Sequence, residues 1–389
     1  MDSRLRQRLP LYPSQFICAV TMVSLGPLLD AMMRELGIPL RQGGLVPVGF
    51  FLGQVIGIVV LNTHLAKMPA KWALVAGATL QGVGLVAAGA GSWNLSSLFA
   101  AYLVAGTGWA LINTIGWMWI TAHVKTGTAA AALVMALFFS MGMTLTPLVL
   151  GLIIDLGLTW RWIVAVEGIV SLLFSLTFVA LPLQDIPGRR NVRLPHVRQT
   201  AAASPRLFLG IVGASFMYVG AEANLEIWLP KFQLDVFGAS DAWASVSVAL
   251  FCLGITAGRL GLRPLTYRYS PSRILLACAL TLAVTATGVA LANTQTVSLV
   301  LSTAAGLGAS ASFGIIGSYS GRFPAWQSAV ASSVFVFAGG VGSIVFPYLT
   351  GPIASAGGFR LALAMTAVPA LAYAAFSLVI RAGSGEKPQ

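Results

Sequence analysis

Charged residues are scarce in this chain of 389 residues, and acidic residues are the scarcest, with 11 Asp and Glu against 23 Lys and Arg. Only 9% of the residues are charged while 57% are hydrophobic, which excludes the surface of an ordinary soluble protein. Apolar runs of about 20 residues, the length a helix needs to cross a bilayer core, recur from end to end. We therefore expect an integral membrane protein.

Cysteine is also rare. Cys18, Cys252 and Cys278 all lie in apolar runs, with no CxxC pair or neighbouring His cluster, so we predict neither a disulfide framework nor a metal site. We find no nucleophile with a paired base and no phosphate-binding glycine loop. The sequence thus predicts no catalytic residue, no cofactor and no enzymatic or ATP-driven function. Without a basic soluble domain, no nucleic-acid partner is expected either.

Glycine, proline and charged residues divide the apolar runs into twelve predicted helices. We expect an all-α membrane protein of two pseudo-symmetric six-helix bundles, residues 1–182 and 206–389, the second with a short C-terminal tail. A polar, arginine-rich cytoplasmic linker, residues 183–205, joins them. The predicted helices lie near residues 11–34, 42–63, 72–91, 95–121, 127–156, 161–182, 206–234, 242–260, 273–292, 295–320, 325–354 and 359–381.

The basic residues predict the orientation of these helices. If both termini are cytoplasmic, all but five of the 23 Lys and Arg residues lie on the inner side, as the positive-inside rule requires. The five exceptions are Arg34, Arg41, Arg161, Lys231 and Arg360. This predicts an integral protein of a bacterial cytoplasmic (inner) membrane with both termini inside.

The two halves repeat each other. At an offset of 200, Gly106 and Gly108 match Gly306 and Gly308, Gly142 matches Gly342, and Pro147 matches Pro347. At an offset of 201, Gly53 and Gly57 match Gly254 and Gly258. A nearly constant offset across several helices indicates duplication of a six-helix unit, the pattern of parallel-repeat transporters.

Twelve spans, a basic central linker and two parallel halves together resemble the major facilitator superfamily. The resemblance implies two bundles around a central cavity lined by helices 1, 4, 7 and 10, with alternating access to a small-molecule substrate. The loop after helix 2, Gly57 to Lys71, departs from the family's gating motif because it has no acidic residue. The counterpart from Gly254 to Arg263 keeps the Gly-Arg pattern better.

The sequence Tyr218-Val-Gly-Ala-Glu222, followed by Trp228-Leu-Pro230, resembles the fucose/glucose/galactose branch of that superfamily. Members of this branch are typically proton- or sodium-coupled sugar symporters. The resemblance therefore implies transport of a small polar solute such as a sugar, with protons as the coupling ion and sodium as the alternative.

Acidic residues inside the predicted helices are the candidates for proton coupling, because carboxylates in a bilayer are costly and usually functional. Glu222 and Glu226 stand four residues apart, on one helical face with Tyr218. Asp30 in the first helix either takes part in coupling or pairs with Arg34, four residues on. Glu167 is expected to contact a neighbouring helix or face lipid, and its role stays open.

Five residues are candidates for binding the solute. Gln54 and Asn113 offer both donors and acceptors, which suit a hydroxyl-rich ligand, although a hydrogen bond between helices would use them equally well. Trp109, Trp228 and Tyr218 could stack on a sugar or form walls of a cavity, but tryptophans also anchor helices at membrane interfaces.

Two other functions fit the same residues. The aromatic residues and the few polar side chains would suit efflux of amphipathic or lipid-like compounds. The degenerate first gate would suit a membrane receptor that transports nothing. In every case we expect a monomer in contact with membrane lipid.

Overall fold

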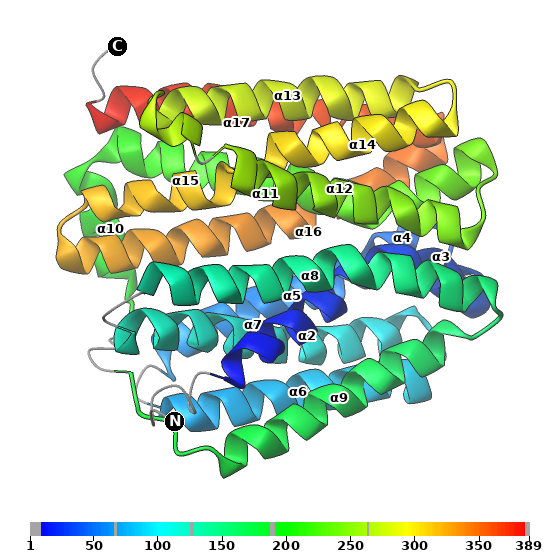
Figure 1. Ribbon diagram of the computed structural model, residues 1–389, viewed down its shortest axis with the longest axis horizontal. Helices are drawn as coiled ribbons and strands as arrows, with labels where there is room; N and C mark the ends of the chain where they lie inside the picture. Colours follow the sequence, from blue (N-terminus) through cyan, green and yellow to red (C-terminus); the bar gives the residue numbers. More distant parts are fainter. Residues whose placement is uncertain (1–8, 66–67, 125–127, 187–190, 263, 386–389) are drawn as a thin grey trace. The chain divides into compact units, whose positions relative to one another are not determined.

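The computed structural model describes residues 9–65, 68–124, 128–186, 191–262 and 264–385, and nearly all of this part of the chain is helical (Figure 1). Eleven described helices are long and apolar enough to cross a membrane, and the bent pair Leu11–Val23 and Leu25–Leu36 makes a twelfth span. The all-α membrane fold predicted from the apolar runs is confirmed. Nine basic residues used to predict the orientation lie outside the described residues: Arg4, Arg6, Arg8, Lys67, Lys125, Arg189, Arg190, Arg263 and Lys387.

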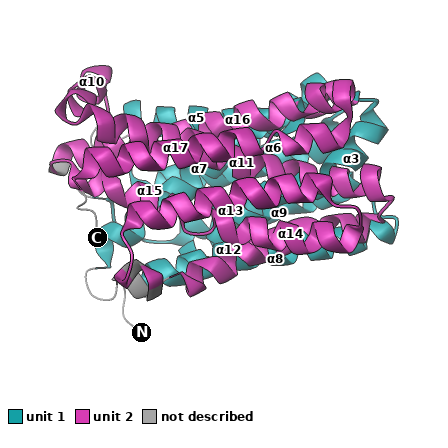
Figure 2. Ribbon diagram, turned by 90° about the horizontal axis from the view of Figure 1, so that it is seen from above, with its two compact units in different colours: residues 1–39, 45–191 teal, residues 40–44, 192–389 magenta. Residues whose placement is uncertain are grey.

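The chain divides into two compact units, residues 1–39 with 45–191 and residues 40–44 with 192–389 (Figure 2). Unit 1 holds α2 (Leu11–Val23), α3 (Leu25–Leu36), α5 (Leu45–Thr63), α6 (Ala70–Gly91), α7 (Leu95–His123), α8 (Thr128–Asp155) and α9 (Trp160–Ala180). Unit 2 holds α4 (Leu40–Gly43), α10 (Leu194–Ala203), α11 (Pro205–Phe237), α12 (Asp241–Gly261), α13 (Pro271–Leu291), α14 (Gln295–Ala309), α15 (Ser312–Ser318), α16 (Ala325–Ala364) and α17 (Ala367–Ser384).

Some predicted spans are broken rather than continuous. The first is bent by 43° between α2 and α3, because Pro27 has no N–H to donate and its ring crowds the carbonyl of residue 23. The tenth stops at Ser310, whose hydroxyl bonds to Leu307 O and whose own carbonyl accepts a hydrogen bond from Arg259. Such side-chain bonds compete with the helix ladder.

Two further differences concern the ends of elements. The linker between the halves contains the helix α10, which the polar composition did not predict. The last predicted span, 359–381, begins within α16 after a break at Gly358, where φ is +83°, and is interrupted again before α17. A positive φ of this size is readily available only to glycine, so the turn between the last two spans depends on that residue.

The repeated glycines make the same contacts in both units. A Cβ on Gly106 would lie within 3.0 Å of the Phe50 carbonyl, and one on Gly306 equally close to that of Phe251. In the same way, Gly53 faces the backbone of residue 103 and Gly254 that of residue 303. These contacts pack α5 along α7 in unit 1 and α12 along α14 in unit 2 (Figure 1). Because repeat-related residues carry repeat-related packing, the structure supports the duplication.

We predict that Gly106→Ala destabilises unit 1 by about 1–3 kcal/mol, since the new methyl group must push α5 away from α7. The matched control is Gly91→Ala at the end of α6, where a Cβ would meet no atom within 4 Å. Thermal unfolding of the purified proteins in one detergent measures the difference. Equal melting temperatures for the two variants would show that the backbone contact is not as tight as described.

Candidate functional site

The predicted acidic pair lies on α11, where Tyr218, Glu222 and Glu226 follow one another at intervals of one helical turn. Tyr218 is fully buried, Glu226 is 2% exposed, and Glu222 is partly buried. Placing two carboxyl groups one turn apart in an apolar helix makes simultaneous ionisation of both costly. Glu222 and Glu226 therefore remain the candidates for the predicted proton coupling.

Neighbouring helices of unit 2 complete this cluster. Arg259 and Cys252 of α12 interact electrostatically with Glu222, and so does Tyr373 of α17. The rings of Tyr218 and Tyr373 lie 5.6 Å apart between their centroids. We call these residues the α11 cluster: Tyr218, Glu222, Glu226, Cys252, Arg259 and Tyr373. It combines two carboxyl groups, one guanidinium, two phenols and one thiol.

Several polar atoms of the α11 cluster have no hydrogen-bond partner. The Tyr218 hydroxyl interacts electrostatically with Glu222 but does not form a hydrogen bond of good geometry. The hydroxyl of Tyr373 interacts with that of Ser312, also without a hydrogen bond of good geometry, and the Oε1 atom of Glu226 is buried and unpaired. Buried polar groups in folded proteins nearly always have partners. The cluster therefore has hydrogen-bonding capacity left over for a polar ligand.

Sequence reasoning missed Arg259, Cys252 and Tyr373 as members of the cluster. Arg259 counted only as an inner-side basic residue, although the preceding glycines, Gly254 and Gly258, mark a helix face that packs closely on its neighbour. A cation at the end of such a face could have indicated a partner for the acids. Tyr373 carried no sequence signal that sets it apart from other tyrosines.

The polar candidates of unit 1 also keep unpaired atoms. Gln54 of α5 is 7% exposed with Nε2 unpartnered, and Asn113 of α7 has an unpartnered Oδ1. The alternative of a hydrogen bond between helices thus leaves at least one atom of each amide unused. Asp30 of α3 is 7% exposed and pairs with Arg34 at 2.9 Å, the intrahelical ion pair that the spacing allowed.

The two tryptophan candidates hold helices together. Trp109 donates its indole N–H to the carbonyl of Cys18 at 2.6 Å and packs against Phe50. Trp228 is fully buried and donates its N–H to the carbonyl of Pro347 at 2.9 Å. The role of Trp228 as a wall of the cavity is not tested by this contact and stays a prediction. Trp109 is 8% exposed, so its role as a wall stays a prediction.

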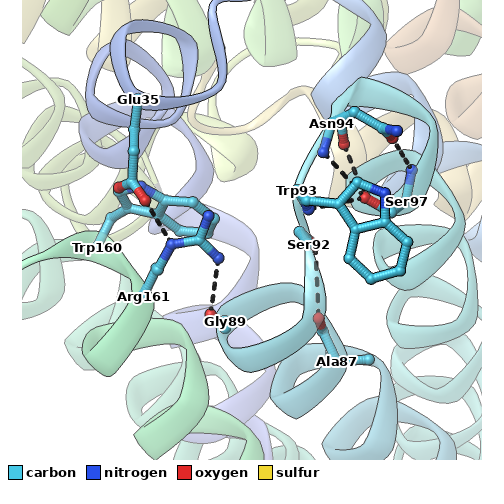
Figure 3. A network of polar contacts seen from close by, with 9 residues as sticks. All are labelled: Glu35, Ala87, Gly89, Ser92, Trp93, Asn94, Ser97, Trp160 and Arg161. Carbon is cyan, nitrogen blue, oxygen red and sulfur yellow. Dashed lines mark hydrogen bonds and ion pairs between the residues drawn. The ribbon is translucent and has the colours of Figure 1, made fainter.

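A second polar network lies in unit 1, where α3 ends and α9 begins (Figure 3). Glu35 accepts hydrogen bonds from the indole N–H of Trp160 and from Arg161, both at 2.5 Å. Arg161 also donates to the carbonyl of Gly89 at 3.1 Å. The network joins three helix ends through the ion pair of Glu35 and Arg161, whose partners are both partly exposed. We interpret it as a structural contact that holds these helix ends together.

Comparison with known proteins identifies the family. The Major Facilitator Superfamily model matches residues 11–317, so the chain belongs to this family. It is accordingly a transporter and not an enzyme. None of the curated protein sequences matches it.

Solved structures share the fold at low sequence identity. A bacterial homologue of the human lysosomal transporter Spinster is 14% identical with a TM-score of 0.78, and the match covers 100% of this chain and 99% of that one. The nucleoside transporter NupG is 14% identical with a TM-score of 0.74 over 100% of both chains. A D-xylose–proton symporter is 14% identical with a TM-score of 0.73, over 97% of this chain and 95% of that one.

We predict that Trp228→Phe lowers the stability of the protein by about 1–3 kcal/mol, because the carbonyl of Pro347 loses its buried donor. Trp243→Phe is the matched control, since Trp243 of α12 is 57% exposed. Thermal unfolding of both variants measures the effect. An unchanged melting temperature for Trp228→Phe would argue against a structural role for its indole N–H.

Proposed function

We propose that the protein is a secondary active transporter that moves a small polar solute, such as a sugar or a related compound, by alternating access and in symport with protons. The observation that carries this proposal is the α11 cluster, in which Glu222 and Glu226 share one helix face with unpaired hydroxyl groups. Glu222 is the coupling residue, with help from Glu226 or from Asp30 in unit 1.

The charges of the α11 cluster explain why Glu222 rather than Glu226 couples transport. Glu222 interacts with Arg259, so its ionised form has a cation nearby. Glu226 is more deeply buried and has an unpaired oxygen. Glu222 can therefore exist in both charge states, and a change in charge changes its attraction to the Arg259 side of α12. A carboxyl group with two accessible states can link proton binding to helix movement.

The unpaired polar atoms favour a hydroxyl-bearing solute over an apolar one. The hydroxyl groups of Tyr218 and Tyr373 in unit 2 make no hydrogen bond of good geometry, so both remain able to bind a polar group. An apolar ligand at the α11 cluster would leave these atoms unsatisfied at a cost of about 1–3 kcal/mol for each buried group. Within unit 1, Gln54 and Asn113 separately keep unpaired amide atoms. The nucleoside transporter and the D-xylose–proton symporter with the same fold carry polar solutes, in keeping with this proposal.

The cellular setting follows from the same proposal. We place the protein in a bacterial cytoplasmic membrane with both termini inside, where an inward proton gradient would drive uptake. The proposal keeps the protein as a monomer in contact with membrane lipid. Sodium is the alternative coupling ion.

We predict that Glu222→Gln abolishes accumulation driven by a proton gradient while leaving solute exchange intact, because glutamine mimics the neutral acid but cannot release a proton. Sugars, nucleosides, organic acids and lipophiles are first screened by thermal shift. Radiolabelled hits are then measured in proteoliposomes with and without an imposed gradient. Asp235→Asn is the control, since Asp235 stands on the same helix in an ion pair with Lys231.

Each outcome of this experiment separates the proposals. Gradient-driven uptake that survives in Glu222→Gln removes Glu222 from coupling. Hits confined to lipophiles favour efflux of amphipathic compounds, and a protein that moves no solute favours the receptor hypothesis.

We also predict a pH dependence of exchange. Exchange without net proton movement needs Glu222 neutral on both sides of the membrane, so the wild-type rate falls as the pH rises and the carboxyl group ionises. Glu222→Gln keeps the neutral form at every pH, and its exchange rate stays flat. The measurement is counterflow of the identified solute with the same pH inside and outside. A parallel decline in both proteins would assign the pH dependence to another group.

A further inference from the structure

A further buried carboxyl group lies in unit 1, on a helix that carries none of the candidate coupling or binding residues named above. Glu167 of α9 is 9% exposed, and its Oε2 atom lies 3.3 Å from the hydroxyl oxygen of Ser24. Its other oxygen, Oε1, is buried without a hydrogen-bond partner. Ser24 is the residue at which the first span bends between α2 and α3. The carboxyl group therefore contacts the first span at its break.

The hydroxyl group of Ser24 has two possible acceptors but only one hydrogen to donate. Its oxygen lies 3.3 Å from Glu167 Oε2 and 3.2 Å from the carbonyl oxygen of Thr21. If Glu167 is ionised, it can only accept, so Ser24 must donate to it and leave Thr21 O. If Glu167 is protonated, its own O–H can donate to Ser24, and Ser24 can donate to Thr21 O at the same time. The protonated state satisfies one more group at the bend.

The surroundings offer no cation to Glu167 in the described part of unit 1. Arg161 on the same helix is bound to Glu35 and Gly89 (Figure 3), and Arg34 pairs with Asp30. The remaining titratable groups of the packed helices are Tyr12 and Cys18 on α2, the N-terminal Lys71 of α6, and Tyr102 and His123 on α7. Of these, Tyr102 interacts electrostatically with Glu167. An ionised Glu167 would thus be poorly compensated, and such charges are costly in a bilayer.

The contact in unit 2 that corresponds to Ser24 and Glu167 is made by neutral side chains. Asn224 stands at the offset of 200 from Ser24, and it contacts the last span through Thr366, close to the offset from Glu167. Asn224 donates to Thr366 at 2.8 Å and accepts from Thr350 at 2.7 Å. Neutral side chains join the first and last spans of unit 2 with both amide atoms satisfied. Unit 1 instead has an ionisable group with an unpaired oxygen.

We propose that Glu167 is a second proton-binding site, in unit 1, and that its proton occupancy selects the hydrogen bonding of the bend at Ser24. Proton loss transfers the Ser24 hydrogen from Thr21 O to the carboxylate, which loosens the last turn of α2 relative to α3. Proton gain restores the bond and stabilises the bend. This inference does not depend on Glu222 or on the identity of the solute.

Infrared difference spectroscopy tests the proposal. Spectra of the full-length protein in lipid nanodiscs are recorded at a series of pH values and subtracted from one another. In the wild type we expect a carboxylic-acid carbonyl band that disappears as the pH rises. Glu167→Gln loses this band. The control Glu35→Gln keeps it, because it changes the carboxylate of unit 1 that pairs with Arg161. Ser24→Ala keeps the carboxyl group but removes its hydrogen-bond partner, so the band persists and shifts to higher frequency.

The variants allow two ways to overturn the proposal. If Glu167→Gln shows the same pH-dependent carboxylic-acid bands as the wild type, Glu167 does not change its protonation state. If Glu167→Gln does not fold, Ser24→Ala still decides, because an unshifted band in that variant means that no titrating carboxyl group contacts Ser24. Bands lost in Glu222→Gln alone would place all proton binding in unit 2 and contradict a site in unit 1.

Discussion

The bilayer core offers no hydrogen-bond partners, and this constraint decides which polar side chains of the chain are informative. Each polar group in a span must be satisfied by the protein or leave a cost of several kcal/mol. Many of them are satisfied locally. The hydroxyl groups of Thr107 and Ser302, for example, donate to the carbonyl oxygen four residues earlier in the same helix. Polar atoms that remain unpaired are therefore exceptions that need a reason. They concentrate on α11 and its neighbours, and at the amides of unit 1.

Close backbone packing is the second consequence of the same constraint. Between helices in lipid, association depends on van der Waals contact rather than on burial of apolar surface from water, so small residues let backbones approach. Gly106 and Gly306 do this at repeat-related positions, against Phe50 and Phe251. Glycine at these sites is set by contact distance, since neither has a positive φ. The duplication visible in the glycine spacing is thus a duplication of helix contacts.

The fold could be predicted from the sequence because it depends on local quantities. The length and apolarity of each run indicated the spans, and the spacing of Glu222 and Glu226 placed both on one face of α11. Contacts between helices could not be predicted in the same way. The indole of Trp228 finds the carbonyl of Pro347, and Arg259 joins the acids from another helix, through packing that no short pattern encodes. Pro27 could have indicated the break in the first span, because proline within a helical run interrupts the hydrogen-bond ladder.

The two repeats differ where their first and last spans meet. In unit 2 an asparagine between two threonines fixes that contact with neutral hydrogen bonds, while the acids lie further along α11. In unit 1 the same kind of contact has a carboxyl group beside a bend, and the polar residues further along are the amides Gln54 and Asn113. A duplicated scaffold starts with equivalent contacts, so a substitution that replaces a satisfied neutral pair by an ionisable one has a cost in stability. At the bend beside Ser24 this cost has a counterpart that a straight helix would lack, because under our proposal the charge state of Glu167 selects the hydrogen bonding of the bend.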